Sequence, residues 1–197
     1  MKTSKYQRRY YRDWIREKSF CVTQIIAHQT DIRITTNKKL DKSLAEERIR
    51  IYRYQVERYI NRDPRFLSAL GPMPVELNAP AIIQHMAKEA KKANVGPMAT
   101  VAGAIAESLG RDLLKDGYKD VIVENGGDIF LCSRKVRYVG IYSGRSKTWD
   151  RLCLKVKPAD MPIGICTSSG TIGHSLSFGR ADSVVVLSKS TSLADAV

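Results

Sequence analysis

The segment Gly164-Ile-Cys-Thr-Ser-Ser-Gly-Thr-Ile-Gly-His174 organises the chain around a dense run of small and hydroxyl-bearing residues. Its glycines permit positive φ angles and a close approach of backbone to a ligand. Successive N–H groups in such a loop form an anion nest, and hydroxyls beside them can donate and accept. The composition predicts a loop between strands that binds phosphate or carboxylate, with His174 beside it. A serine- and glycine-rich turn without a ligand has the same composition, so both interpretations stay open.

Apolar runs on both sides of this segment predict strands. Residues 183–188 follow it, and residues 137–142 and 152–157 precede it. Residues 121–132 form two apolar runs around Asn125-Gly126-Gly127-Asp128, which is typical of a tight β-hairpin turn. Near the start of the chain, β-branched residues at 20–26 and 32–36 predict an N-terminal hairpin.

Helical spacing of apolar residues predicts a helix over residues 44–60, with Asp41 or Ser43 as its cap. Pro80 opens a second helix, on whose face His85 lies. After residues 96–97 a third helix is built almost wholly of small residues, namely Ala99, Ala102, Gly103, Ala104 and Ala106. Small side chains allow either tight packing on a sheet or a flat ligand across the helix N-terminus.

Length and composition fit a soluble globular protein with one sizeable core. The chain has 197 residues, of which 43% are hydrophobic and 27% charged. It contains no apolar run long enough to span a bilayer. The first ten residues lack the apolar core of a secretory signal, which predicts a cytoplasmic protein. Ser190 or Ser192 can cap a last helix from Leu193 that stops after one turn, so the C-terminus reads as truncated.

A net charge of +13 favours anionic partners in general. Residues 6–15 interleave aromatic side chains with arginines, as some nucleic-acid-binding segments do. The alternation suits a strand with a solvated face better, so nucleic acid is an unlikely partner. None of the four cysteines lies in a C-x-x-C pair. Cys166 is interpreted as a buried residue at a strand end rather than a catalytic thiol.

Five motifs occur in one order, namely residues 96–107, 124–129, 166–171, 173–179 and 192–197. In this order the sequence closely resembles an uncharacterised prokaryotic family related to ApbE, the flavin transferase once linked to thiamine biosynthesis. The resemblance covers essentially the whole chain. It implies a single ApbE-like domain over 1–197, with a hairpin and helix in 1–66 and a core in 79–197. The implied fold is α/β (α+β) and has two layers, a mixed or antiparallel sheet and the helices packed on it.

The resemblance also implies a site. ApbE proteins use magnesium to move FMN from FAD onto a threonine of an acceptor protein. By similarity, residues at the hairpin turn contact the flavin or adenosine, and residues of the hydroxyl-rich segment line the pocket and hold the phosphates. His174 corresponds to the family's histidine, and Asp195 to its acidic Mg²⁺ ligand. The cofactor-binding residues implied are Gly126, Gly127, Asp128, Thr167, Ser168, Ser169, Gly170 and Thr171.

Three departures from the flavin transferases bear on activity. Residues 98–103 lack the lysine of the Gly-Gly-Ile-Ala-Lys-Gly motif, and residues 177–182 replace Asp-Pro-x-Thr-Gly. The threonine that follows the acidic ligand lies beyond residue 197. These departures favour a protein that keeps the FAD-binding shape and loses flavin transfer. The first function that the resemblance as a whole implies is binding of FAD or another nucleotide with Mg²⁺-dependent FMN or phosphoryl transfer. The alternatives are a ligand-binding member of the fold that acts in sulfur assimilation or homocysteine biosynthesis, and, least favoured, a basic RNA-binding protein.

Overall fold

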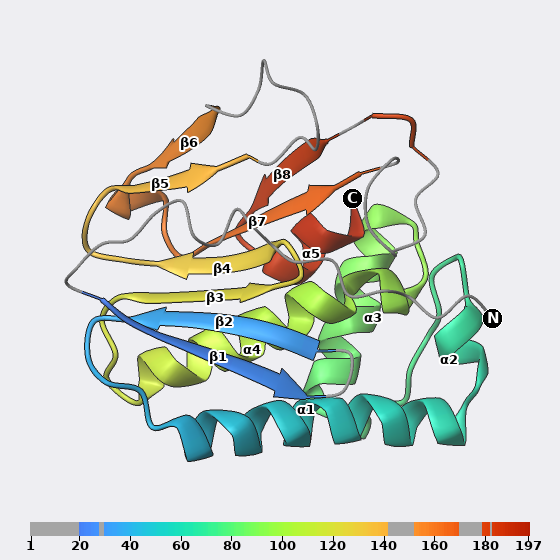
Figure 1. Cartoon of the computed structure of the whole chain (residues 1–197). Coiled ribbons are helices and arrows are strands. Elements are labelled where there is room, and N and C mark those ends of the chain that lie inside the picture. The colour runs from blue at the N-terminus through green and yellow to red at the C-terminus, as the bar shows by residue number, and fades with distance from the viewer. Residues whose placement is uncertain (1–19, 28–29, 142–151, 170–178, 182) are drawn as a thin grey trace.

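A computed structural model describes residues 20–27, 30–141, 152–169, 179–181 and 183–197 (Figure 1). Within these residues six strands form one antiparallel sheet in the order β1-β2-β3-β4-β7-β8. Their bounds are β1 Cys21–Ala27, β2 Thr30–Thr36, β3 Val121–Asn125, β4 Asp128–Cys132, β7 Ile163–Ser168 and β8 Val184–Ser188. The fold is thus α+β with an antiparallel sheet, and the predicted N-terminal hairpin is confirmed as β1–β2.

Helices cover one face of this sheet (Figure 1). Their bounds are α1 Lys42–Arg62, α2 Arg65–Ser68, α3 Ala81–Ala93, the 3-10 turn η2 Pro97–Thr100, α4 Val101–Lys115 and α5 Thr191–Ala196. Asp41 is the α1 cap, because its carboxylate accepts the Leu44 N–H at 3.1 Å. The central helix α4 packs on β3 and β4, and the short α5 packs on β7 and on α4.

The core lies between the sheet and these helices. Ile32 and Ile34 of β2 and Val121 and Val123 of β3 alternate in sequence and are fully buried on the helix side. On the opposite face, the two-stranded sheet of β5 (Arg137–Gly140) and β6 (Cys153–Val156) forms a smaller apolar cluster with β4 and β7. The short turn η3 (Pro158–Asp160) connects β6 to β7.

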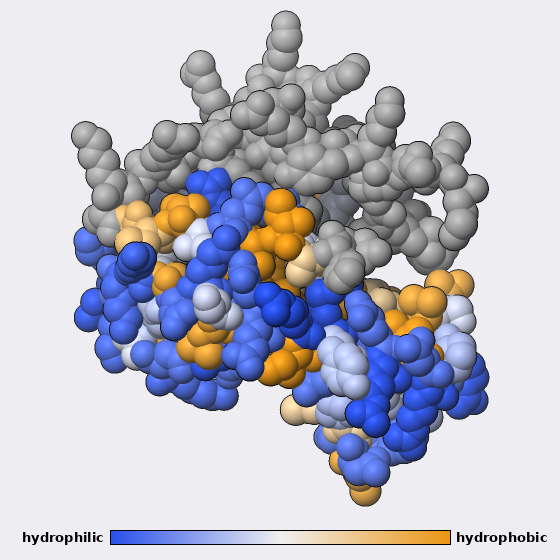
Figure 2. Space-filling view, turned by 60° about the horizontal axis from the view of Figure 1, so that its bottom comes forward, coloured by the Kyte–Doolittle hydropathy of each residue, from blue (hydrophilic) through white to orange (hydrophobic). Residues whose placement is uncertain are grey.

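The outer side of α1 is a solvated surface. Figure 2, which brings this side forward, shows a largely hydrophilic face on which the apolar patches are separate rather than continuous. Leu44, Ile51 and Tyr54 are the exposed large apolar side chains of α1. Scattered single residues of this kind are ordinary on soluble proteins.

The expected loop starts later than the sequence predicted. Residues 163–168 are strand β7, which pairs with β4 on one side and with β8 on the other. Gly164 is needed there because a Cβ would lie 2.4 Å from the Cα of Thr191 on α5. Close packing against α5 therefore accounts for the small residue at Gly164 without a ligand.

Candidate functional site

The β3–β4 hairpin brings Asp128 to the helix-covered face of the sheet. Gly126 and Gly127 have φ angles of 74° and 118°, and Asn125 pairs with Asp128 across this two-residue turn. Strand alternation places Asp128 on the same face as the buried Phe130. The Asn125 Nδ2 donates to the carbonyl of Ala102 at 3.1 Å, which ties the hairpin to the start of α4.

Asp195 reaches the same place from α5. Its Oδ2 accepts the backbone N–H of Gly103, in the first turn of α4, at 2.7 Å. The two helices touch here, because a Cβ on Gly103 would lie 2.5 Å from the carbonyl oxygen of Thr191 and 2.8 Å from the Asp195 Cβ. Of the two interpretations of the small-residue helix, the described residues therefore show tight packing at Gly103.

Gly103→Ala is expected to destabilise the protein by about 1–3 kcal/mol, the usual cost of overpacking. The added methyl must push α5 away from α4 and with it the Asp195 carboxylate. Urea unfolding measures the loss. Ser108→Ala, at a partly exposed position of the same helix, is the control for helix propensity alone, with an expected gain of about 0.5 kcal/mol. A Gly103→Ala protein as stable as the wild type would contradict this close packing.

Asp128 lies close enough to the buried carboxylate of Asp195 for its charge to act on it. Burial raises the pKa of Asp195 well above its ordinary value, and the charge of Asp128 raises it further. The amides of Gly103 and Ala102 act in the opposite direction without cancelling these effects. Part of the Asp195 residue is exposed, but its carboxylate is desolvated. Carboxylates that repel each other in this way are stabilised by sharing a proton or by binding a cation.

A divalent cation would fit this pair only with additional oxygen ligands. Among the residues that the structure describes, no group of three His, Cys, Asp or Glu side chains is placed to hold a metal. Mg²⁺ commonly binds through one or two carboxylates plus water and substrate phosphate oxygens. The donor chemistry of Asp128 and Asp195 matches that kind of site and not a closed structural zinc site.

Cys166 lies beside the carboxylate pair but is not a nucleophile. It is fully buried on β7, and its Sγ donates to the carbonyl oxygen of Thr191 at 3.5 Å. Burial raises the pKa of the Cys166 thiol far above its usual range, and the charges of Asp128 and Asp195 raise it further. A thiol held protonated in this way is inert. The sequence-based interpretation of Cys166 as a buried strand residue is confirmed.

Part of the predicted cofactor site meets near this pair. Thr167 and Ser168 end β7, and Ser169 follows them partly buried. The hairpin turn lies close to this strand end, since a Cβ on Gly127 would be 3.7 Å from the carbonyl oxygen of Thr167. Gly170, Thr171 and His174 lie outside the described residues, as does the aromatic and basic segment 6–15. The ligand roles of all these residues stay predictions.

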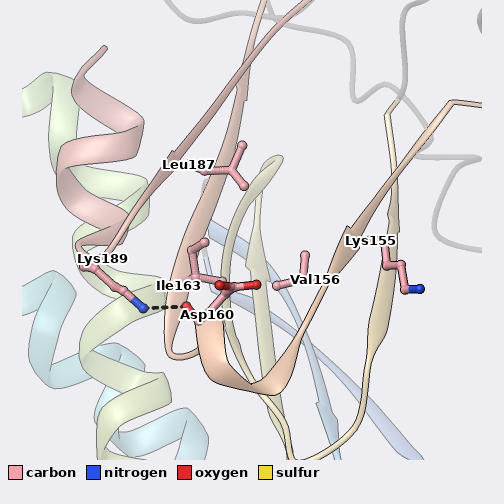
Figure 3. Close-up of a pocket in the computed structure, with 6 residues that line it drawn as sticks. All are labelled: Lys155, Val156, Asp160, Ile163, Leu187 and Lys189. Carbon is pink, nitrogen blue, oxygen red and sulfur yellow. Dashed lines mark hydrogen bonds between the residues drawn. The ribbon is translucent and has the colours of Figure 1, made fainter.

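A cavity of about 270 Å³ lies on the opposite face of the sheet (Figure 3). Lys155, Val156, Asp160, Ile163, Leu187 and Lys189 line it. The Lys189 Nζ donates to the backbone carbonyl of Asp160 at 2.6 Å. Strand alternation turns Ile163 to the side opposite from Gly164, which packs against α5. This cavity is therefore separate from the carboxylate pair.

The sequence analysis missed Glu107 and the contact of His85 with it. Glu107 lies on α4 and is only 3% exposed. Its carboxylate accepts hydrogen bonds from α3, α4 and the start of α5. A glutamate within a run of alanine and glycine residues was the available sequence signal, since a charge on a buried helix face requires partners. Its partners on α5, Thr191 and Ser192, are more than 80 residues away in the chain.

No helix in the described part of the chain is long and apolar enough to cross a membrane.

Comparison with known proteins gives consistent matches. A family model described as AbpE bacteria matches residues 12–197. The UPF0280 protein of Methanocaldococcus jannaschii is 45% identical over 175 residues, which are 88% of this chain and 70% of that protein. The UPF0280 protein of Methanococcus vannielii is 46% identical over 162 residues, which are 81% of this chain and 65% of that protein.

Solved structures share the fold at low sequence identity. A mutant of the flavin transferase ApbE from Vibrio cholerae superposes with a TM-score of 0.55 and 14% identity, covering 90% of this chain and 84% of that one. The apo flavinyl transferase ApbE of Pseudomonas stutzeri gives a TM-score of 0.57 and 10% identity, covering 90% and 82%. These matches confirm the predicted ApbE-like fold.

Proposed function

The chain belongs to the UPF0280 family, and on this premise we propose that it binds FAD with Mg²⁺ beside Asp128 and Asp195 and transfers FMN from it. The observation that carries the proposal is the carboxylate pair, in which burial and the charge of Asp128 raise the pKa of Asp195. The charge of Asp128 beside the desolvated Asp195 carboxylate favours a bound cation. A metal ion bound together with a pyrophosphate would supply that positive charge.

The residues around the pair have distinct proposed roles. Asp128 and Asp195 hold the cation by their carboxylate oxygens, and Gly126 and Gly127 allow the flavin or adenosine to approach the hairpin turn. Backbone N–H groups of residues 168–171 bind phosphate oxygens. When bound, Mg²⁺ supplies positive charge to the pyrophosphate oxygens.

The proposed transfer is a phosphoryl substitution. The hydroxyl oxygen of an acceptor-protein threonine forms a bond to the FMN phosphorus of FAD. The bond from that phosphorus to the bridging oxygen breaks, and AMP leaves with the electron pair. The proton of the hydroxyl passes to a base, for which His174 is the candidate.

In a second candidate function, the protein binds the ligand but does not catalyse FMN transfer. Residues 98–103 lack the lysine of the flavin transferases, and the Gly103 N–H already donates to Asp195. Such a protein would bind a flavin or another anionic small molecule and serve sulfur assimilation or homocysteine biosynthesis. The reaction products distinguish it from the transferase.

The test is FAD binding and AMP release by the purified protein, with Mg²⁺ and with the metal chelated. Quenching of flavin fluorescence measures binding, and chromatography measures AMP after incubation with a threonine-containing acceptor protein. We expect FAD to bind at least about tenfold more tightly with Mg²⁺ than without it, since the ion neutralises charge on both partners. Binding without AMP release supports the second candidate. Absence of FAD binding under both conditions contradicts the proposal.

A further inference from the structure

Helices α4 and α5 are joined by reciprocal hydrogen bonds, in which a carboxylate of each helix accepts backbone N–H groups of the other. Asp195 of α5 accepts the Gly103 N–H of α4, and Glu107 of α4 accepts the N–H groups of Thr191 and Ser192 at 2.8 and 3.2 Å. Each carboxylate lies four residues, about one helical turn, beyond the amide on its own helix. The two helices are thus joined twice, once at each end of the shared turn.

Glu107 is surrounded by donors. Besides the two amides, its Oε2 accepts the Ser190 hydroxyl at 3.2 Å and the His85 Nε2 of α3 at 3.3 Å. Its Oε1 accepts the Arg111 Nε and Nη2 at 2.9 and 2.7 Å. Burial raises the pKa of Glu107, but the His85 and Arg111 hydrogen bonds outweigh it and lower that pKa to about 2. The group is therefore a buried, fully ionised carboxylate aimed at the start of α5.

Helix α5 needs such a contact to keep its place. It has six residues, too few for a helix to be stable by itself. Thr191 and Ser192 are fully buried, yet neither hydroxyl has a hydrogen-bond partner among the described residues. The backbone N–H groups of both residues donate to the Glu107 carboxylate of α4.

We propose that Glu107 is the positioning residue for Asp195: it fixes the first turn of α5 so that the carboxylate one turn later meets Gly103 and Asp128. His85 and Arg111 hold Glu107 in the required orientation. The placement of Asp195 by Glu107 follows from the hydrogen bonds above. Its consequence for metal binding rests on the proposed function.

Amide hydrogen exchange of Glu107→Gln tests the geometry. The Gly103 amide reports on Asp195, because it donates to that carboxylate. We expect the amides of Thr191, Ser192 and Gly103 to exchange about ten- to a hundredfold faster, the scale of a lost charged hydrogen bond. The amide of Val123, at the centre of the sheet, should change far less. Glu89→Gln is the matched control, because Glu89 is a buried glutamate of α3 whose carboxylate accepts hydrogen bonds from Lys92 of the same helix.

Two results would overturn the proposal. In one, the Thr191 and Ser192 amides exchange faster while the Gly103 amide does not, so that Asp195 does not depend on Glu107. In the other, exchange rises equally at Gly103 and Val123, so that Glu107 serves global stability alone. His85→Ala removes one donor from the partly exposed side of the network and is the milder variant should Glu107→Gln not fold. It should accelerate the same three amides severalfold.

Titration with Mg²⁺ alone, by calorimetry, separates this proposal from the previous one. We expect Glu107→Gln to weaken Mg²⁺ binding about ten- to a hundredfold, as loss of an outer-shell partner does in other metal sites, and Glu89→Gln to leave it unchanged. Absence of Mg²⁺ binding to the wild-type protein would contradict the proposed function. The exchange rates of the Thr191, Ser192 and Gly103 amides would then still test whether Glu107 positions Asp195. Wild-type protein that binds Mg²⁺ as tightly as Glu107→Gln contradicts the positioning role.

Discussion

Asp195→Asn is expected to abolish the response to Mg²⁺ and at the same time to stabilise the metal-free protein. Burial and the charge of Asp128 disfavour the ionised form of Asp195, as the raised pKa of that group indicates. An asparagine keeps the oxygen that accepts the Gly103 N–H and removes the repulsion. Without metal, we expect a gain on the order of 1 kcal/mol, about 2–4 °C in Tm for a chain of this size.

Adding Mg²⁺ should make the wild-type protein more stable than Asp195→Asn. The wild type gains about 2.7 kcal/mol when free Mg²⁺ is a hundredfold above its Kd. Asp195→Asn lacks a charged ligand, so its affinity should fall at least about a hundredfold, the upper end of what outer-shell changes cause. Thermal unfolding of both proteins with Mg²⁺ and with a chelator checks this. Asp128→Asn should behave in the same way, because the repulsion is mutual. Metal-free Asp195→Asn less stable than wild type would show that the carboxylate is not strained.

The expected pH dependence of the effect of Asp195 on stability agrees with this. Its folded pKa is raised, so the folded protein takes up a proton more readily than the unfolded chain does. The cost of ionising Asp195 in the folded protein is therefore fully present above the folded pKa and is lost as the pH falls through the folded pKa toward the ordinary value. The stabilisation by Asp195→Asn should accordingly be larger at neutral pH than in acid.

Local sequence patterns predicted much of the fold. The Asn-Gly-Gly-Asp turn, the β-branched runs of the N-terminal hairpin and the apolar period of α1 each act over a few residues, and each is found where expected. The family resemblance supplied the global arrangement, which periodicity alone does not specify. It also selected Asp195, a residue that local chemistry alone would assign to an ordinary helix turn.

The sequence predicted less of the site, because contacts between distant residues define it. Gly103 meets Asp195 at a separation of 92 residues, and Glu107 meets Ser192 at 85. No local pattern encodes such pairs. In the hydroxyl-rich segment a local pattern is present but has two interpretations, because a glycine allows both the close approach of a ligand and the close packing of a helix. At Gly164 and Gly103 the structure shows packing against α5.

Acid should unfold this protein over a range set in large part by Glu107. The pKa of this group is lowered to about 2 in the folded protein, against an ordinary value of 4.5. At about 1.4 kcal/mol for each pH unit, this difference corresponds to about 3 kcal/mol of stability at neutral pH. As the pH falls below 4.5 the unfolded chain takes up the proton first, so the stabilisation is lost progressively until about pH 2.

Glu107→Gln isolates this contribution, because glutamine has the shape of the protonated acid. The free energy of unfolding, measured by urea at a series of pH values, should differ between wild type and variant by about 3 kcal/mol at pH 7. This difference should shrink steadily between about pH 4.5 and pH 2 as the wild-type carboxylate is protonated. Asp63→Asn is the comparison: the Arg65 hydrogen bond also lowers the pKa of Asp63, but that pair lies at the surface, where screening leaves little net stability. If the difference in the free energy of unfolding between wild type and Glu107→Gln stayed constant across this pH range, Glu107 would stabilise α5 by its shape and not by its charge.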